Sequence, residues 1–578
     1  MNIKFDENIN YDLFVIGCCR SSSTRQGGER GAERNEKASR MNDTKVRFDV
    51  VIVGYGPVGA ALANLLGNYG VKTLVVDRDD DIFMSPRAIA LDNEALRVLQ
   101  MAGIGEDAFE RIAIPMVHLY SPLFGEFGRI SSGGSLDGHP KLVTFYQPEL
   151  ERALRDRLAQ AECVETWTGT TLVNFEQSDD AVRVDFVKGD GENTSVVARY
   201  LVGADGASSF VRKQIGQDFK GTTYAQDWLI VDARHTAEPI DRAEFICDPR
   251  RPGPHMIAPG GRERWEFMLL PGEDPAEMES DTKVRELLRP WTDGEEPEIE
   301  RKAVYRFHAR TVECFQRGRV FLAGDAAHIT PPFAGQGLVA GLRDAANLGW
   351  KLAWVIKGRS PESILASYDT ERRPHAVAII RLAQFLGRLI MPRNIVVAAI
   401  VHGSLRTLRT LPFVRRWFDE LGMKPKNEFK HGLFVRGASR ARLVRGGVLP
   451  QGWVRAPDQP IRLSDDVLGP ALCLIGFGRD PRGWLDDHTA AAFADAGGRC
   501  IQIRHRGQTL HRSADLPLWE DLDATLMPTA APFGWCAVVR PDRTIMHDGP
   551  VEEAARIVRE ALSLLAASTH ATPANTAA

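Results

Sequence analysis

The chain has few of the features that tie a protein to metals, nucleic acids or membranes. Its eight cysteines form no CxxC pair and follow no regular spacing, so reduced thiols in a cytoplasmic protein, and no metal site, are expected. Lysine and arginine number 72 against 76 aspartate and glutamate, a net charge of −4 without a basic block, which argues against nucleic acid as a partner. The most apolar stretch, 379–401, contains three arginines and a proline, so no membrane span is predicted.

One stretch, residues 48–77, organises a chain that at 578 residues is long enough for two to four domains. It runs from a short β-branched apolar segment through glycines spaced GxGxxG into a helix-period segment, and ends on a second apolar segment and Asp77. Gly54 permits the tight turn, Gly56 lets a pyrophosphate approach the backbone, and Gly59 lets the helix pack closely on the strands. Because Asp77 can accept hydrogen bonds from an adenosine ribose, the pattern predicts a dinucleotide-binding βαβ unit.

Three shorter signals follow downstream. Residues 200–212, YLVGADGASSFVR, place Asp205-Gly206 after an apolar strand and Arg212 in the helix beyond it. Arg87 stands in a loop before an amphipathic helix, and either a surface position or a phosphate or flavin contact fits it. Gln147 precedes a helix with proline in its first turn, where its side chain could reach a cofactor.

A second glycine-bearing strand end lies within residues 318–351. Gly324-Asp325 ends an apolar strand, and Gly335 and Gly337 open a long helix. A carboxylate at a strand end can hold sugar-alcohol hydroxyls, and glycines at a helix start let a flat ring lie against the backbone. The helix dipole there would stabilise an anion on that ring. We interpret His328, early in the loop, as structural rather than catalytic.

These motifs together resemble the FAD-dependent aromatic hydroxylases, the single-component class that includes p-hydroxybenzoate and phenol hydroxylases. GYGPVG is similar to the family's GxGxxG, Asp205-Gly206 with Arg212 to its DG motif, and Gly324-Asp325 through Pro331 to its GD motif. The resemblance runs from about Arg47 to His375, with motif order and spacing kept. Relatives often have Asn where this chain has Val339, so only the backbone could serve the ring there. The cofactor-binding residues that the resemblance implies are Gly54, Gly56, Pro57, Gly59, Asp77, Arg78, Arg87, Gln147, Asp205, Gly324, Asp325, Pro332, Gly335, Gly337, Leu338 and Val339.

The resemblance implies an α/β fold with a Rossmann-like FAD-binding domain, interleaved with a β-sheet substrate domain, and a C-terminal thioredoxin-like domain. The expected division is a disordered extension at 1–46, the FAD-binding domain at 47–390 with the substrate sheet at about 217–305, a helical linker at 391–455, the thioredoxin-like domain at 456–565 and a disordered tail at 566–578. Without CxxC the last domain is expected to be structural or to contact a second subunit in a homodimer. Segment 11–17, YDLFVIG, lacks a glycine turn, and natural translation is expected to start at Met41.

Within the family, four segments are most similar to hydroxylases of 3-(3-hydroxyphenyl)propanoate: SPRAIALDNEALR, CDPRRP, WEFMLLPGE and ERRPHA. The implied reaction is ortho-hydroxylation to 3-(2,3-dihydroxyphenyl)propanoate in aromatic catabolism, with FAD, NADH or NADPH, and O2, through a flavin C4a-hydroperoxide. No second βαβ fingerprint offers the nicotinamide a domain of its own, and the Pro331-Pro332 loop is expected near the reacting oxygen. His308, Tyr224 and His255 are all open as the catalytic base. The alternatives are the same chemistry on another phenol or polyketide, a flavin dehydrogenase without oxygen insertion, and a non-catalytic flavin-binding protein.

Overall fold

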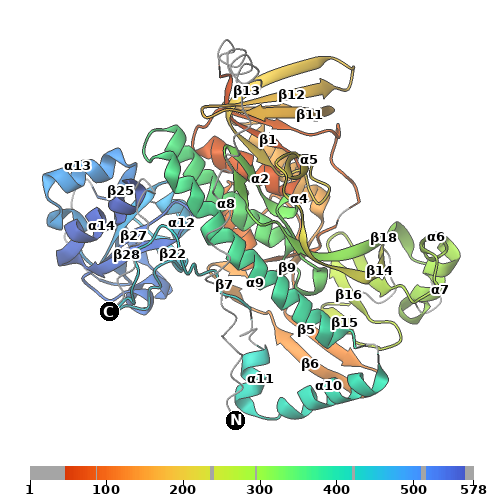
Figure 1. The fold of residues 1–578 in the computed structure, drawn as a ribbon. Helices are drawn as coiled ribbons and strands as arrows, with labels where there is room; N and C mark the ends of the chain where they lie inside the picture. The colour runs from red at the N-terminus through yellow and green to blue at the C-terminus, as the bar shows by residue number, and fades with distance from the viewer. Residues whose placement is uncertain are drawn as a thin grey trace, which may run out of the picture.

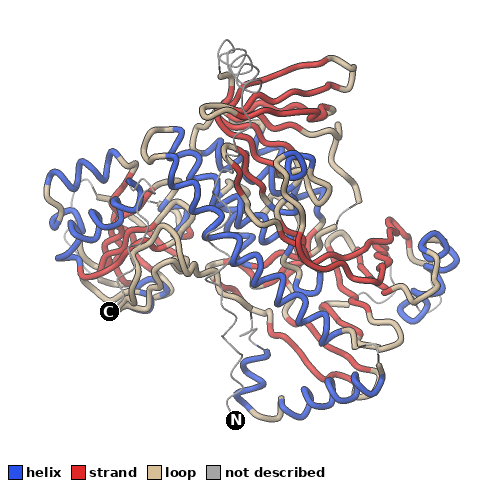
Figure 2. The backbone as a smooth tube through the Cα atoms, viewed as in Figure 1, coloured by secondary structure: helices blue, strands red, loops and turns tan. Residues whose placement is uncertain are grey.

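A computed structural model describes residues 46–566, apart from 86, 235–239, 293–295, 393, 420–423, 458 and 509–515. Three sheets form the body of the described chain, and Figure 2 shows them as three separate groups of strands. The expected extension at 1–46, with segment 11–17 and Met41, lies outside the described residues up to residue 45, as does the expected tail beyond residue 566.

The first sheet contains the predicted βαβ unit. Its strand order is β10-β2-β1-β13-β12-β11, with β20 pairing beside β13 and β19 beside β20. Strand β1 is parallel to both β2 and β13, and β20 is parallel to β13. The strands are β1 (Phe48–Val53), β2 (Thr73–Val76), β10 (Val164–Trp167), β11 (Thr170–Gln177), β12 (Val182–Lys188), β13 (Asn193–Gly203), β19 (Gln316–Arg317) and β20 (Val320–Leu322).

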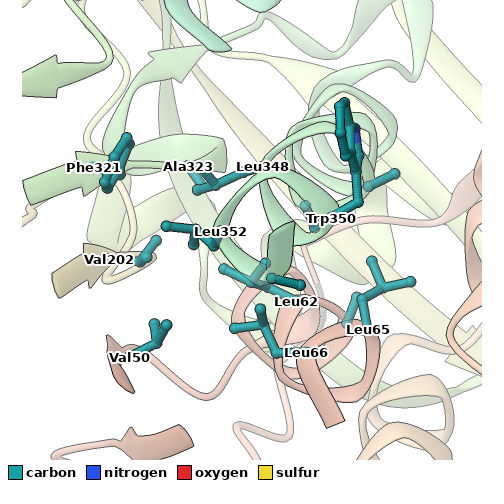
Figure 3. Packing of buried hydrophobic residues seen from close by; sticks show 14 of the residues in the cluster. Val50, Leu62, Leu65, Leu66, Val202, Phe321, Ala323, Leu348, Trp350 and Leu352 are labelled. Carbon is teal, nitrogen blue, oxygen red and sulfur yellow. The ribbon is translucent and has the colours of Figure 1, made fainter. Parts of the chain in front are cut away.

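Two helices, α2 (Pro57–Asn68) and α8 (Gly337–Ile356), pack side by side on this sheet. Both carry continuous apolar faces, and Figure 3 shows Leu62 and Leu66 of α2 near Leu352 of α8, beside the strand residues Val50 and Val202. Parallel strands that are covered by helices are buried on both faces, which explains their β-branched, nearly uninterrupted apolar sequences. The same core holds the two predicted glycine turns at one end of the sheet. Helices α3 (Asn93–Met101), α4 (Gln147–Leu158) and α5 (Phe210–Gln214) complete this part of the chain.

The second sheet has the order β21-β18-β14-β17-β16-β15-β5-β6. It includes β5 and β6, which come from residues 116–131 and so extend the sheet beyond the expected range of about 217–305. Its strands are β5 (Met116–Ser121), β6 (Gly125–Ser131), β14 (Lys220–Arg234), β15 (Ala243–Ile246), β16 (Gly253–Ala258), β17 (Arg262–Met268), β18 (Glu298–Thr311) and β21 (His328–Ile329). A small sheet of β3 (Ala90–Asp92), β9 (Leu142–Phe145) and β4 (Arg111–Ala113) comes from the same part of the sequence as β5 and β6.

The two faces of the second sheet have different partners. One face packs Leu229 and Trp265 against α6 (Pro275–Met278) and α7 (Asp281–Thr292). The other face packs Trp228 and Met268 against Phe333 and the long helix α9 (Ser367–Ile390). Because Phe333 follows the Pro331-Pro332 loop, this second face is the one turned toward the glycine-bearing strand ends. In Figure 1, α8 and α9 cross the middle of the molecule between the sheets.

The predicted linker is helical only in its first part. Helices α10 (Ile395–Leu408) and α11 (Pro412–Asp419) lie at one end of the molecule beside β6 (Figure 1), where His402 stacks on Phe127. From 424 to β22 (Trp453–Arg455) the described residues form no helix, in a segment with prolines and several glycines. No single described helix is long and apolar enough to cross a membrane, although the pair Glu362–Ile390 and Ile395–Leu408, bent by 109°, passes that test by length and composition.

The C-terminal part is built on a third sheet, with the order β23-β22-β26-β25-β24-β27-β28. Strands β24 and β25 run parallel, as do β25 and β26, whereas β27 and β28 are antiparallel neighbours at one edge. Its elements are β23 (Arg462–Leu463), α12 (Ser464–Leu468), β24 (Leu472–Phe477), α13 (Asp487–Asp495), β25 (Gly498–His505), β26 (Leu518–Asp521), β27 (Trp535–Val539), β28 (Ile545–Pro550) and α14 (Ala554–Ala566). All six cysteines of the described residues are free thiols.

Candidate cofactor and active site

The predicted motifs meet at one edge of the first sheet. Val53 at the end of β1 pairs with Val76 of β2 and with Gly203 of β13, and Gly203 pairs in turn with Leu322 of β20. Four strands therefore end in register, and the carboxyl ends of parallel strands are where open α/β sheets bind their ligands. The residues that follow these ends are the glycine turn, Asp77, Asp205 and Asp325.

The glycine turn has the geometry that its spacing predicts. Gly54 has a φ of +105°, and a Cβ there would come within 2.3 Å of the Ala204 carbonyl oxygen. A Cβ on Gly59 would lie 2.0 Å from the Gly54 carbonyl oxygen, whereas one on Gly56 would meet no atom within 4 Å. Two glycines thus allow close packing, while the third leaves open space beside the N-terminus of α2, where Pro57 starts the helix.

Asp77 holds the turn from the next strand. Its carboxylate accepts hydrogen bonds from the backbone N–H of Tyr55 at 2.6 Å and of Asp79 at 3.0 Å. Arg78 beside it is largely exposed and lies 3.9 Å from Asp79. An Asp at this position both shapes the glycine loop and keeps oxygen lone pairs for a ribose.

Asp205 has a local role. It accepts hydrogen bonds from the Ser209 hydroxyl at 2.5 Å and from the backbone of Phe210 at 2.7 Å and Val211 at 3.1 Å, at the start of α5. Burial raises the pKa of this carboxyl, and these bonds offset part of that cost. The carboxylate therefore fixes the turn.

Arg212 joins two of the motifs directly. Its guanidinium donates to the carbonyls of Ala207, at 3.0 Å, and Ala326, at 3.4 Å, and lies 3.8 Å above the Phe219 ring. Ala326 follows Asp325, so one side chain ties the Asp-Gly turn after β13 to the Gly-Asp turn after β20. The arginine that the sequence singled out thus acts on the backbone of both turns.

Asp325 is the carboxylate with the most freedom in the site. Gly324 before it has a φ of +58° and packs against Val58 of the first glycine motif. A Cβ on Gly324 would lie 3.1 Å from Val58 Cγ2. Among the residues that the structure describes, no donor bonds the half-buried Asp325 carboxylate. Burial raises the pKa of Asp325, and its electrostatic interactions with His328 and Arg87 lower that pKa in part. A half-buried acid without a protein partner is suited to hydroxyl groups of a ligand.

The loop before α8 is open where the sequence predicts a flat ring. Gly335 is exposed with a φ of +61°, and Gly337 begins the helix. Pro332 and Leu338 are half-buried, whereas the Val339 side chain is fully buried in the core. Val339 can therefore contribute only its backbone.

Gln147 reaches a loop backbone. Its Oε1 accepts from the N–H groups of Arg87, at 3.0 Å, and Ala88, at 2.9 Å, while its Nε2 donates to Glu151 at 2.7 Å. The Arg87 guanidinium itself lies 5.9 Å from the centre of the Tyr305 ring. Gln147 thus positions the Arg87 loop, and Arg87 is close enough to Asp325 to affect its pKa.

Sequence reasoning missed a buried network beneath the loop Gly335-Gln336-Gly337, the GQG loop. Gln336 donates to Asp92 at 3.1 Å, and Asp92 also accepts from Arg343 at 3.2 Å and from Lys424 at 2.7 Å. Arg343 bonds Glu94 as well, at 2.7 Å. The sequence signal was the glutamine between two glycines. The other members of the network are distant in sequence, because Asp92 lies 244 residues from Gln336 and 332 residues from Lys424.

The three candidate bases occupy different places. His255 is buried on the α6–α7 face of the second sheet, where it bonds Glu263 and stacks on Trp265, so it faces away from the strand ends. His308 is paired with the Thr223 hydroxyl at 3.1 Å. Tyr224 contacts the Phe333 ring, with 5.7 Å between centroids, and burial raises its pKa.

His328 is buried and bonds Asp344 at 2.6 Å. Asp344 also accepts from the Gly324 N–H at 3.1 Å and from Arg372 at 2.9 Å. This network supports the loop from below and agrees with a structural role for His328. Among the described residues, no group of three or more His, Cys, Asp or Glu side chains could hold a metal ion.

Comparisons with known proteins define the class. Residues 47–383 match the model of a family described as FAD binding domain, and 446–564 match one described as HcaD C-terminal domain. The fold is similar to that of the flavin-dependent monooxygenase PieE, solved with FAD and substrate, with a TM-score of 0.75 and 21% identity over 90% of this chain and 99% of that one. It is also similar to OxyS anhydrotetracycline hydroxylase from Streptomyces rimosus, with a TM-score of 0.69 and 25% identity over 90% and 99%. The chain has the fold of FAD-binding monooxygenases.

Relatives with named activities identify the family within this class. The chain is 37% identical, over 87% of its length and 94% of the relative, to 3-(3-hydroxy-phenyl)propionate/3-hydroxycinnamic acid hydroxylase 2 of Burkholderia vietnamiensis. It is 35% identical, over 86% and 88%, to a hydroxylase with the same two substrates in its name from Mycolicibacterium gilvum. The chain belongs to the FAD-dependent aromatic hydroxylases, which are aromatic-ring monooxygenases, and FAD is its cofactor. The open space at Gly56 and the unpartnered Asp325 carboxylate fit the two halves of that cofactor.

Proposed function

We propose that this enzyme ortho-hydroxylates a phenolic aromatic acid, 3-(3-hydroxyphenyl)propanoate, to 3-(2,3-dihydroxyphenyl)propanoate. NADH would be the reductant and O2 the oxygen donor, and the reaction would serve aromatic catabolism. When bound, FAD would take a hydride from NADH, activate O2 and deliver one oxygen atom to the ring. The observation that carries the proposal is the in-register ending of β1, β2, β13 and β20, which sets Asp77 and Asp325 along one edge.

Different residues would hold different parts of FAD. Gly54, Gly56, Gly59 and Asp77 would hold the ADP half at the N-terminus of α2, with its free N–H groups toward the pyrophosphate. Asp325 would bind the ribityl hydroxyls. The isoalloxazine would lie against the exposed backbone of the GQG loop and the start of α8. Pro57, Arg78, Arg87, Pro332, Leu338 and Val339 would line this path, whereas Gln147, Asp205 and Gly324 would shape the loops that line it.

An aromatic wall would keep water from the reacting ring. Phe333 contacts Trp228, Tyr224 and Phe307, with centroid separations of 5.9, 5.7 and 6.0 Å. These rings belong to the apolar cluster between the second sheet and α9. Exclusion of water matters because an activated oxygen atom that is not transferred is lost unproductively.

Two further features of the expected fold complete the proposal. We infer that the βαβ half of the first sheet is Rossmann-like and that the C-terminal domain is thioredoxin-like. Among the described residues of the C-terminal domain the cysteines are free thiols, and the domain contacts the body through buried ion pairs. A structural role follows, with a homodimer contact as the finer proposal.

Purified holoenzyme, NADH and a panel of phenols under ¹⁸O2 test the function. We expect NADH oxidation to rise with 3-(3-hydroxyphenyl)propanoate and to give a catechol with one ¹⁸O atom next to the original hydroxyl. Faster turnover of another phenol in the panel would identify that phenol as the substrate instead. Dye reduction with no labelled catechol from any phenol would identify a flavin dehydrogenase and overturn the proposal.

A further inference from the structure

Glu266 is a buried carboxylate outside the proposed FAD-binding residues. It lies at the centre of β17 with 7% of its surface exposed. Within the part of the chain that the structure describes, no donor bonds its side chain. A buried polar group without a partner calls for an explanation, and a missing ligand is one of the common ones.

The strand register places Glu266 on the face that turns toward the flavin edge. Side chains alternate along a strand, so Arg264, Glu266 and Met268 share a face. Arg264 donates to the carbonyl of Arg87 at 3.0 Å, and Met268 belongs to the same apolar cluster as Phe333. Glu266 thus lies between the Arg87 loop and the Phe333 loop, which carry Arg87 and Pro332, two of the residues proposed to line the path of FAD.

The positive charges near Glu266 balance the negative charge of its carboxylate only in part. Ile230 stands opposite it on β14. The charged groups that face it are Arg264 on its own strand, Asp232 on β14 and Arg301 on β18. Asp232 accepts hydrogen bonds from two of the three guanidinium nitrogens of Arg264, at 2.6 and 2.9 Å, and from Arg301 at 3.2 Å. Both arginines are therefore already engaged by Asp232.

These surroundings keep Glu266 ready to exchange a proton near neutral pH. Burial raises its pKa to about 7, Arg264 and Arg301 lower it, and Asp232 raises it further. A carboxyl in this range can act as a general base at the pH of the cell, because its pKa is close to the working pH. His255 is excluded from that role by facing away, and Tyr224 is a neutral phenol itself.

We propose that Glu266 is the catalytic base that accepts the proton of the substrate phenol, an inference that rests on the proposed hydroxylation. The phenol O–H bond breaks, the proton passes to a carboxylate oxygen of Glu266, and the electron pair stays on the phenol oxygen. That pair makes the ortho carbon a better nucleophile toward the oxygen atom delivered from O2. The new C–O bond forms as the O–O bond breaks, and the proton of the ortho C–H bond then moves to the ring oxygen, which restores the aromatic ring as a catechol. The proton on Glu266 leaves with the second oxygen atom of O2, which takes its other hydrogen from the reduction by NADH. Water forms, and the carboxylate is restored.

The kinetic test compares Glu266→Gln with two controls. In the wild type, kcat for catechol formation should rise with pH through about 7, because the base must be ionised. Glu266→Gln should lose this limb and about 10²- to 10⁴-fold in kcat, the usual range for a general base, while it keeps its FAD content. Glu266→Asp should keep the limb. Glu263→Gln, the same change on the opposite face of β17, should also keep it.

Two further readouts separate a base from a structural role. A ring-fluorinated, more acidic phenol should recover more of the lost rate in Glu266→Gln than in the wild type. A non-reacting probe, the substrate with a nitro group beside its hydroxyl, reports its own ionisation by absorbance. Removing the negative charge in Glu266→Gln should lower the pKa of the bound probe by about one unit or more.

The outcomes distinguish the two proposals. If the wild type makes catechol while Glu266→Gln keeps the pH limb and the pKa of the bound probe, the role of Glu266 is wrong and the hydroxylation stands. If no phenol in the panel is hydroxylated, the proposed function fails, and the base role fails with it even where the probe shows that Glu266 touches the phenol.

Discussion

At the scale of single residues, the site depends on carboxylates whose surroundings differ. Asp77 accepts hydrogen bonds from the backbone N–H groups of Tyr55 and Asp79, and Asp205 accepts them from the backbone at the start of α5. Asp325 has no donor among the described residues. The spacing of the motifs predicted that all three follow strand ends. It could not predict which of them keeps its oxygens free, because that depends on the local turn. The same limit applies to Gln147, whose amide is taken up by the Arg87 loop.

Replacement of Asp325 is expected to weaken FAD binding. Asp325→Ala removes a charged acceptor of hydroxyl hydrogen bonds, which contributes about 1.5–3 kcal/mol per bond. The FAD dissociation constant should therefore rise about 10- to 100-fold, measured by fluorescence titration of apoprotein. The FAD dissociation constant of Asp325→Asn, which keeps a neutral acceptor, should lie between those of the wild type and Asp325→Ala. Unchanged flavin retention in Asp325→Ala would show that this side chain does not touch the cofactor.

At the scale of elements, the glycine turn separates ligand space from packing space. Gly54 and Gly59 are close to backbone atoms, whereas Gly56 faces open space with a φ of −70° that any residue can adopt. Helix α8 and its loop repeat this arrangement, with Gly324 packed on Val58 and Gly335 exposed. The sequence predicted both turns because glycine spacing and strand ends are local signals. The pairing of the two turns through Arg212 was beyond its reach.

Two alanine variants in this turn should behave differently. Gly56→Ala should leave the stability of the apoprotein within about 1 kcal/mol, because the new Cβ meets nothing, yet it should lower FAD affinity by crowding the pyrophosphate. Gly59→Ala should cost about 1–3 kcal/mol even without FAD, because its Cβ would overlap the Gly54 carbonyl. Thermal unfolding of both apoproteins, with FAD titrations, measures the contrast. Equal destabilisation of the two apoproteins would contradict this division.

At the scale of the whole molecule, buried ion pairs fix the C-terminal domain to the FAD-binding body. Arg540 after β27 forms two hydrogen bonds to Glu371 of α9, at 2.7 and 2.9 Å, and Lys351 of α8 bonds the same carboxylate at 2.7 Å. Arg97 of α3 forms a similar pair with Asp465 of α12. The sequence indicated a separate C-terminal domain from its strand pattern, but contacts between distant segments leave no periodic signal. The joining of β5 and β6 to the second sheet was missed for the same reason.

Glu371→Gln tests this clamp. Burial alone would raise the pKa of Glu371, but Arg540 and Lys351 more than offset it and hold the pKa well below its usual range. The carboxylate therefore stabilises the fold above its unfolded pKa of about 4.3, and that contribution is lost as the pH falls below this value. Glu371→Gln should cost about 3–5 kcal/mol at pH 7, with a smaller difference from the wild type below pH about 4.

Unfolding monitored by circular dichroism at saturating FAD measures these differences. Glu192→Gln is the control, because it removes only an exposed pair with Lys188 and should cost less than about 1 kcal/mol. The pKa of Lys351 is lowered to about 8 by burial, so this lysine should make stability rise with pH between about 8 and 10.4. A Glu371→Gln protein as stable as the wild type at pH 7 would show that the domains are not held by this network.

The most direct test is an experimental structure of the purified protein with its flavin. We predict that one FAD extends along the shared edge of β1, β2, β13 and β20. Its adenosine ribose should lie at Asp77, its ribityl chain at Asp325, and its ring against Gly335 and Gly337. A flavin bound elsewhere, or one that engages only one of the two glycine turns, would contradict the account.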